Sequence, residues 1–256
     1  MDSNANQQAY DRGHTIFSPD GRLYQVEYAR EAVERGSPSV GVVTDDGVVL
    51  AARKRVRSPL LEADTVEKIH RVDDHLAIAS AGHAADARQL VDVARREAQR
   101  HRLRYGEPID AELLAKRLAD HVQEHTQTGG SRPYGVALLV AGVDLDGADG
   151  PQLYEVDPSG TPYGWRAVAV GNGGRDVRQF LEDGIAAGES TRGDLEWGTA
   201  TALEALAATS DEPELTPETV DVWTLETEGS ETAASSPITQ RTDDELASLL
   251  AELELD

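Results

Sequence analysis

Residues 15–29 read TIFSPDGRLYQVEYA and combine a turn with the start of a helix. Ser18-Pro19-Asp20-Gly21 is typical of a turn, because proline fixes one backbone angle and glycine tolerates the tight bend. Apolar side chains then recur near helical spacing over residues 23–33, and Gly36 ends the pattern. The sequence therefore predicts an N-terminal arm and a first helix, which we delimit as residues 1–36.

Beyond this helix, the chain alternates strands with pairs of helices. Two hairpins come first, over residues 39–52 and 66–80, and the first of them turns at Asp45-Asp46-Gly47. The remaining expected elements are helices over 82–104 and 111–126, strands at 136–143, 153–156 and 167–170, helices at 176–187 and 199–208, and a strand at 220–225. Because hairpins join the strands, we expect an α+β fold of stacked antiparallel sheets covered by helices.

The chain divides into one core domain and one tail. Residues 37–225 contain the expected strands and helices, and we interpret them as a single domain. Residues 226–256 are acidic and rich in Ser, Thr and Glu, so we expect a disordered tail. Within that tail, residues 243–255 have the spacing of a short acidic amphipathic helix.

Composition excludes several classes of protein. The formal net charge of −23 makes nucleic acid an unfavourable partner, because phosphate binding needs a basic face. The absence of cysteine excludes disulfides, thiolate metal sites and cysteine nucleophiles. No apolar run is long enough to span a membrane, and the polar N-terminus lacks the apolar segment of a signal peptide. We therefore expect a cytoplasmic protein without a membrane partner.

The acidity has two interpretations. A strongly charged surface can simply keep monomers soluble and apart. Alternatively, the protein is adapted to a very salty cytoplasm, where screening over roughly 3 Å at 1 M salt makes self-repulsion tolerable. We favour the second interpretation, because acidic residues are spread along the whole chain and lysine occurs only at Lys54, Lys68 and Lys116.

Several motifs follow one another in a defined order. They are Tyr10-Asp11-Arg12, residues 15–29, Val66-Glu67-Lys68-Ile69, Ala84-Ala85-Asp86-Ala87-Arg88, and Gly129-Gly130-Ser131-Arg132-Pro133-Tyr134-Gly135-Val136. Together they closely resemble the α-type subunits of proteasomes, most of all the archaeal type, over roughly residues 8–225. The resemblance implies the four-layer αββα sandwich of N-terminal-nucleophile hydrolases.

The resemblance also implies a function. The chain would be a non-catalytic α subunit of a 20S core, in a seven-membered outer ring that gates the entry of unfolded protein substrates. Its partners would be proteasome β subunits, which carry catalysis, neighbouring α subunits in a homo- or hetero-heptamer, and the C-termini of an AAA-type regulatory ATPase. No cofactor is implied.

Lys68 is the side chain most suited to binding. A compact ammonium on a flexible stem can capture a single carboxylate. The resemblance places Lys68 in the pocket between α subunits that accepts an ATPase C-terminus, with Gly36, Gly82 and His83 at other positions of that pocket. The alternative is a solvated surface lysine paired with a nearby carboxylate.

A cluster near the N-terminus also matches functional positions of the family. Tyr10, Asp11, Pro19 and Tyr28 match the cluster that holds the N-termini of the ring in the open state, and residues 1–9 would form a movable plug. The alternative is an ordinary helix N-terminus with core tyrosines.

The loop that narrows the ring's pore would contain Thr128, Gly129 and Gly130. Archaeal relatives typically have tyrosine where this chain has Thr128, so the pore can differ from theirs in width and lining. Glycines after a helix are also ordinary C-caps.

Three other functions compete with this interpretation. A catalytic N-terminal-nucleophile hydrolase needs Gly-Thr before the first hairpin, whereas this chain has Ser37-Pro38-Ser39, so we expect no catalytic residue. His121 and His125 fit the H-x-x-E-H pattern of zinc peptidases, but no third ligand is identifiable, so we expect no metal site. An interaction protein without a protease partner is the third alternative.

Overall fold

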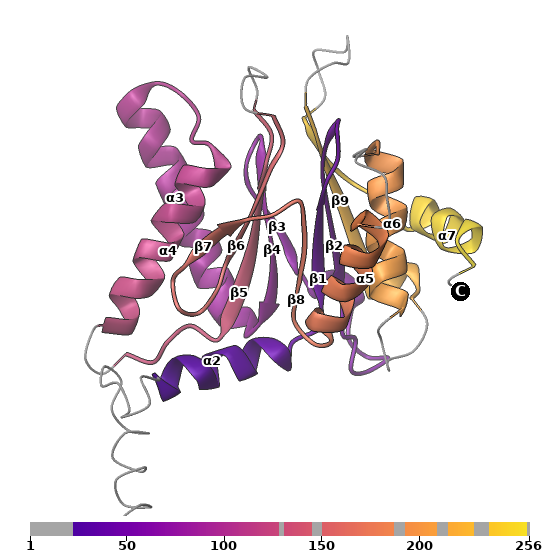
Figure 1. The fold of residues 1–256 in the computed structure, drawn as a ribbon, viewed down its shortest axis with the longest axis horizontal. Coiled ribbons are helices and arrows are strands. Elements are labelled where there is room, and N and C mark those ends of the chain that lie inside the picture. The colour runs from indigo at the N-terminus through magenta and orange to yellow at the C-terminus, as the bar shows by residue number, and fades with distance from the viewer. Residues whose placement is uncertain are drawn as a thin grey trace, which may run out of the picture.

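The computed structural model describes residues 23–127, 131–144, 150–186, 193–208, 215–227 and 236–254. Two antiparallel sheets stand face to face, with helices on both outer sides (Figure 1). The expected α+β sandwich is therefore confirmed.

The first sheet is covered on its outer face by two long helices. Its strands, in spatial order, are β3 (Ile69–Asp73), β4 (Leu76–Gly82), β5 (Val136–Gly142), β6 (Gln152–Val156) and β7 (Pro162–Gly164). The covering helices are α3 (Ala84–Tyr105) and α4 (Ala111–Gln127). A helical turn, η1 (Ala63–Thr65), precedes this sheet in the chain.

The second sheet has helices on the opposite side of the sandwich. Its strands, in spatial order, are β10 (Ile238–Gln240), β9 (Val220–Glu226), β2 (Gly47–Arg53), β1 (Ser39–Val43) and β8 (Ala167–Val170). Its helical elements are α5 (Gly174–Ala186), α6 (Leu195–Ala208), the turn η2 (Pro217–Thr219) and α7 (Asp243–Glu252).

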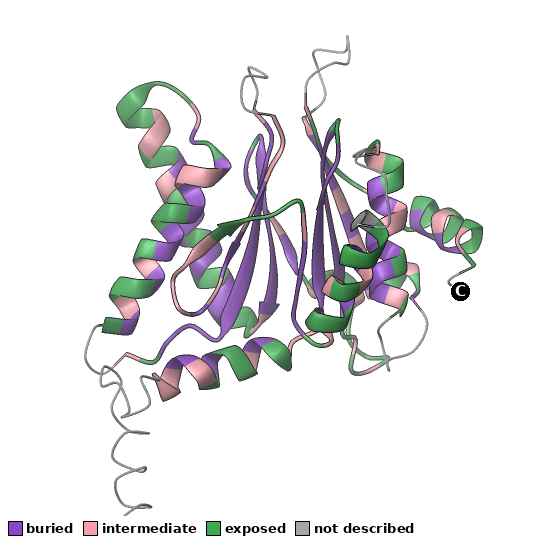
Figure 2. Ribbon diagram, viewed as in Figure 1, coloured by how far each residue is buried: buried purple, intermediate pink, exposed green. Residues whose placement is uncertain are grey.

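Three apolar layers hold the sandwich together. One lies between α3, α4 and the first sheet, one lies between the two sheets, and one lies between the second sheet and α5, α6 and α7. Central strands are covered on both faces, so every residue of β2 and β5 is buried (Figure 2). This explains why both strands are continuous apolar runs in the sequence rather than alternating ones.

Helix α2 (Tyr24–Glu34) lies across one end of the sandwich (Figure 1). It buries Val26, Ala29 and Val33 and contacts β4 and β5. The predicted helical spacing is correct, and the helix brings the start of β1 next to the end of β4.

The C-terminal segment differs from its prediction. A disordered tail was expected over residues 226–256, with a short amphipathic helix over 243–255. In the described part of that tail, β10 pairs antiparallel with β9, and α7 packs on the third apolar layer. Thr242 and Glu245 form a capping box at the start of α7, and Leu246 and Leu250 are buried. The acidic composition predicted disorder for the tail as a whole, whereas the helical spacing within it correctly indicated α7.

None of the helices in the described part of the chain is both long and apolar enough to cross a membrane.

Candidate functional site

The candidate docking site lies where α2 ends and β1 begins. The Lys68 ammonium donates hydrogen bonds to the Ser37 carbonyl, to Ser37 Oγ at 3.0 Å, and to the Pro38 carbonyl at 3.4 Å. Lys68 is only 9% exposed, so it differs from an ordinary solvated surface lysine. Its own carbonyl accepts the Ser80 N–H at 3.0 Å, which fixes the backbone of Lys68 against β4.

Two glycines allow the chain connections at this corner to touch. A Cβ atom on Gly36 would lie 2.3 Å from the Gly82 nitrogen, and one on Gly82 would lie 2.3 Å from the Gly135 carbonyl oxygen. Gly82 also has φ of +120°, which side chains rarely tolerate. His83 follows directly and donates its N–H to the Gly135 carbonyl at 2.9 Å. The structure therefore brings Gly36, Gly82 and His83 together, and Ser37 links them to Lys68.

An ion pair with a buried carboxylate stabilises the same corner from the side of α3. The Arg132 guanidinium donates two hydrogen bonds to the Asp86 carboxylate, both at 2.7 Å, and the Gly135 N–H donates a third at 2.9 Å. Burial acts to raise the pKa of Asp86, but these hydrogen bonds outweigh it, so the pKa is lowered.

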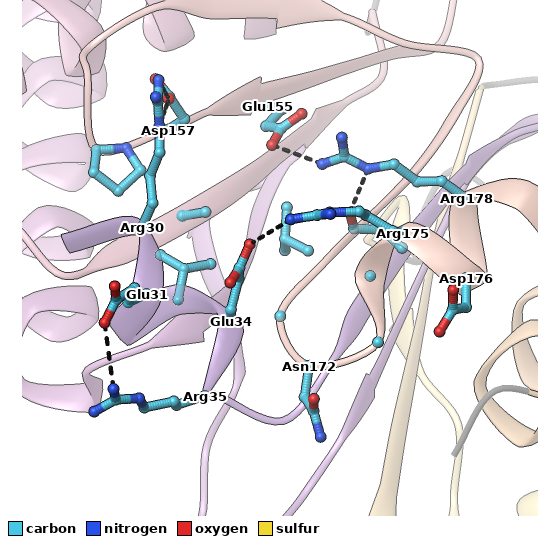
Figure 3. Close-up of a pocket in the computed structure, with 18 of the residues that line it drawn as sticks. Arg30, Glu31, Glu34, Arg35, Glu155, Asp157, Asn172, Arg175, Asp176 and Arg178 are labelled. Carbon is cyan, nitrogen blue, oxygen red and sulfur yellow. Dashed lines mark hydrogen bonds and ion pairs between the residues drawn. The ribbon is translucent and has the colours of Figure 1, made fainter. Parts of the chain in front are cut away.

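An open groove of about 940 Å3 runs alongside this corner (Figure 3). Helix α2 forms one wall, and the β6–β7 and β8–α5 connections form the others. The groove adjoins the glycine corner, because the Asn172 N–H donates to the Gly36 carbonyl at 2.7 Å. Ion pairs cross or line it, between Arg30 and Asp157 at 2.8 Å and between Glu34 and Arg175 at 3.4 Å.

Glu155 is a buried carboxylate in the wall of this groove. Burial raises its pKa, while the Arg178 guanidinium at 3.0 Å acts in the opposite direction. Arg178 also donates to the Ala169 carbonyl at 2.8 Å and lies over the Trp165 ring. The pair therefore ties β6 to β8, and so joins the two sheets.

Where a catalytic hydrolase would need Gly-Thr before the first hairpin, this chain has Ser37-Pro38-Ser39. Ser39 begins β1, is fully buried, and donates its hydroxyl to the Ser80 carbonyl at 2.9 Å. Its nitrogen is part of the peptide bond to Pro38, so it offers no free amine as a base.

The two histidines of the zinc-peptidase pattern pack against an aromatic ring. His125 stacks on Tyr134 with ring centres 4.4 Å apart, and His121 Nε2 lies 3.4 Å from the Tyr134 hydroxyl. Nowhere in the described residues do three His, Cys, Asp or Glu side chains gather in a group that could hold a metal ion.

Other predicted positions cannot be placed in this corner. Tyr28 lies on α2 and is partly exposed. The rest of the predicted gate cluster and pore loop lies outside the described residues: Tyr10, Asp11, Pro19, Thr128, Gly129 and Gly130.

Sequence reasoning missed the Asp86–Arg132 pair and the groove. Both residues of the pair stand in the quoted motifs, but their separation of 46 positions gives no local signal of contact. The groove is assembled from three chain segments that only the fold brings together.

Comparison with known proteins assigns the class. Residues 33–225 match the family model described as "Proteasome subunit", and residues 10–32 match the family model for the N-terminal signature of A-type proteasome subunits.

Three curated relatives narrow the class further. The chain is 55% identical to proteasome alpha subunit 2 of Haloarcula marismortui over 249 residues, which cover 97% of this chain and 96% of the relative. It is 60% identical to proteasome alpha subunit 1 of Haloferax volcanii over 230 residues, with 89% and 87% covered. It is 54% identical to the proteasome alpha subunit of Haloquadratum walsbyi over 256 residues, with 100% and 97% covered.

The chain belongs to the proteasome α-subunit family. The predicted resemblance is thereby confirmed, including its link to halophilic archaea.

Proposed function

We propose that this chain forms the outer, seven-membered ring of a 20S core, gates substrate entry, and docks a regulatory ATPase while catalysis takes place on β subunits. The observation that carries the proposal is the corner at Lys68, where a nearly buried ammonium stands beside two glycines in contact. Unfolded proteins would enter through the ring, and the complex would act in the cytoplasm.

The corner has the chemistry to bind a C-terminal carboxylate. Lys68 donates to main-chain carbonyls and a hydroxyl, which position its ammonium at the corner. Gly36 and Gly82 lack side chains, so the chain's own connections pack closely here and hold the corner in shape beside the ammonium. An AAA-type ATPase that ends in an exposed C-terminus would supply the carboxylate.

Ring formation needs two different surfaces that fit one another. A closed ring of identical chains is built from heterologous contacts, in which one patch of each copy meets another patch of the next. Leu60 is 93% exposed in the loop between β2 and β3, and the open groove beside α2 provides a second, unlike surface. We expect such surfaces to be covered by neighbouring α subunits.

Substrate entry would be controlled by the N-terminal arm. Residues 1–9 are small and polar, and we propose that they plug the pore while Tyr10, Asp11, Pro19 and Tyr28 hold the open state. Deleting residues 2–9 should let the assembled particle degrade long peptides faster without an ATPase. Very short peptides should gain less, and equal acceleration of both would indicate altered chemistry rather than an open gate.

The central experiment is imaging and assay of the purified chain with and without β subunits. We expect a seven-fold ring with an axial pore, and peptide hydrolysis only when β subunits are present. Hydrolysis by the chain alone that persists through further purification would overturn the non-catalytic assignment, and hydrolysis abolished by a chelator would favour the zinc alternative. A monomer that never joins β subunits would overturn the ring.

A further inference from the structure

Asp86 is a buried carboxylate in the first turn of α3, beside the candidate docking corner. It is only 4% exposed, although burial disfavours the charged form of a carboxylate. Acidic residues are favoured in the first turn of a helix, but an exposed aspartate meets that preference equally well. The burial of this charge therefore has a reason other than the helix dipole.

The carboxylate reaches the segment that enters β5. It accepts two hydrogen bonds from the Arg132 guanidinium, both at 2.7 Å, and Oδ2 also accepts the Gly135 N–H at 2.9 Å. The guanidinium is held in turn by donating to the Pro133 carbonyl at 3.0 Å. One buried carboxylate thus fixes the backbone of residues 132–135 against the start of α3.

Gly135 is the residue at which the walls of the corner meet. Its carbonyl accepts the His83 N–H at 2.9 Å, so both polar groups of Gly135 are bound at the start of α3. The same carbonyl oxygen is the atom that a Cβ on Gly82 would approach to 2.3 Å. On the other side, a Cβ on Gly135 would lie 3.1 Å from the Ala32 Cβ of α2. The position of Gly135 therefore sets how closely α2 and the backbone at Gly82 can pack.

The chain of contacts continues to Lys68. A Cβ on Gly36 would lie 2.3 Å from the Gly82 nitrogen, and the next residue, Ser37, accepts a hydrogen bond from the Lys68 ammonium at 3.0 Å. A shift of Gly135 would therefore change the distance between the ammonium and the glycine backbone beside it. Such a shift matters for binding, because the groups of a recognition site must be held within about 0.5 Å of the productive geometry.

We propose that Asp86 is a positioning residue: through Gly135, it holds the walls of the docking corner at the distance from Lys68 that a partner's C-terminal carboxylate requires. Asp86 is buried and would not touch that carboxylate itself. The inference rests on the proposed docking function and adds to it a residue that acts through the backbone. It differs from a purely structural role, because it predicts a loss of carboxylate recognition beyond any loss of stability.

Binding of the full chain to two immobilised peptides tests this inference. Both are short peptides of alternating alanine and serine, one ending in a free carboxylate and the other in an amide. Several corners of one assembled particle can bind the surface together, which brings weak affinities into the measurable range. The ratio of the two affinities measures recognition of the carboxylate, because a lower folded fraction weakens binding of both peptides equally.

Asp86→Asn should lower this ratio about tenfold, since a misplacement of about 1 Å can cost up to about a hundredfold where geometry is demanding. An amide that accepts from Gly135 turns its NH2 group toward Arg132, and the opposite orientation leaves Gly135 without its acceptor. Arg132→Lys keeps the cation but loses the bidentate contact, so it should lower the ratio by a smaller factor. That variant decides the question if Asp86→Asn does not fold.

Leu250→Ala controls for lost stability. Leu250 is buried on α7, on the opposite side of the sandwich from α3 (Figure 1). Because distant sites are usually independent, this variant should leave the ratio within about twofold of wild type. An equal loss of the ratio in Leu250→Ala and Asp86→Asn would overturn the inference, by showing that any destabilisation reaches the corner.

Lys68→Ala separates this inference from the proposed function. We expect it to abolish discrimination between the two peptides. If it keeps the wild-type ratio, or if wild type does not discriminate, the docking corner fails and the inference fails with it. If Lys68→Ala abolishes discrimination while Asp86→Asn retains it, the corner stands and Asp86 has a structural role only.

Discussion

Lys68 and Ser37 are joined by two hydrogen bonds, from the lysine ammonium to the hydroxyl of Ser37 at 3.0 Å and to its carbonyl. The contact spans 31 positions in the sequence and fastens the connection between α2 and β1 to the strand that follows Lys68. One cation therefore stabilises the fold of this corner and, under the proposed function, would also bind the docking carboxylate. The two roles can be separated by experiment.

Replacing Lys68 with alanine should prevent ATPase docking. A carboxylate that meets no ammonium loses on the order of 2–5 kcal/mol when the pair is desolvated. The free energy of unfolding should also fall by about 1–2 kcal/mol, because the Ser37 carbonyl loses its donor. Binding of the ATPase and denaturant unfolding would be measured on the same assembled particles.

Lys116→Ala is the matched control for this variant. Lys116 is a well-exposed lysine on α4 that pairs with Glu112 one turn earlier in the helix, so its loss should change both measurements little. If Lys68→Ala lowers stability but binds the ATPase as tightly as wild type, Lys68 has a structural role only and the docking proposal fails.

Replacing Gly82 with alanine should disrupt the corner. The new Cβ would lie 2.3 Å from the Gly135 carbonyl oxygen, so the backbone must shift, and we expect unfolding to become easier by at least about 3 kcal/mol. Gly106→Ala separates the clash from the backbone angle, because Gly106 has φ of +81° but no atom near its added Cβ. That control should cost only about 1 kcal/mol. Equal losses in thermal unfolding for the two variants would contradict the steric argument.

Local patterns in the sequence predict most of the sandwich. Asp45-Asp46-Gly47 marks the turn between β1 and β2, and the apolar periodicity over residues 84–105 marks α3. These signals suffice because each depends on residues that are neighbours in the chain. The glycines at 36 and 82 were assigned to one pocket by family resemblance alone, and their contact has no signature in either local segment.

Long-range features are invisible to such patterns. The groove depends on how α2 crosses the sheets, which sequence spacing does not encode. Strand β10 has only three residues, too few to show an alternation. Helix α7 was recognised as amphipathic, but its packing partner is the second sheet, which lies far away in the sequence.

The packing of α7 predicts a cost for altering its buried leucines. Leu250 is almost fully buried against the third apolar layer, so Leu250→Ala should lower the free energy of unfolding by about 2–3 kcal/mol. Leu60→Ala removes the same atoms from an exposed side chain and should change the unfolding of the unassembled chain by less than about 0.5 kcal/mol. A disordered tail would instead make the two variants equally stable.

The ion pair between Asp86 and Arg132 predicts a stability difference that depends on pH. The pKa of Asp86 is lower in the folded chain than its ordinary value, because hydrogen bonds from Arg132 and Gly135 outweigh the effect of burial. A depressed pKa means that the stabilisation is fully present above the unfolded pKa of about 4 and is lost as the pH falls through the folded pKa. Asp86→Asn should cost about 2 kcal/mol at neutral pH, since the amide cannot accept the charged bidentate contact.

The difference between wild type and Asp86→Asn should therefore shrink as the solution is acidified below about pH 4. Denaturant unfolding at a series of pH values and constant high salt measures this difference in stability. Subtracting the free energy of unfolding of the variant from that of wild type removes the contribution of the other carboxylates, which titrate in both proteins. Asp92→Asn on the same helix is the control, because Asp92 is half-exposed and its contact with Arg95 is long, at 3.6 Å. The effect of this variant should stay within about 0.5 kcal/mol. A difference for Asp86→Asn that stays constant from neutral to acidic pH would show that the carboxylate's shape, rather than its charge, holds Arg132 and Gly135 in place.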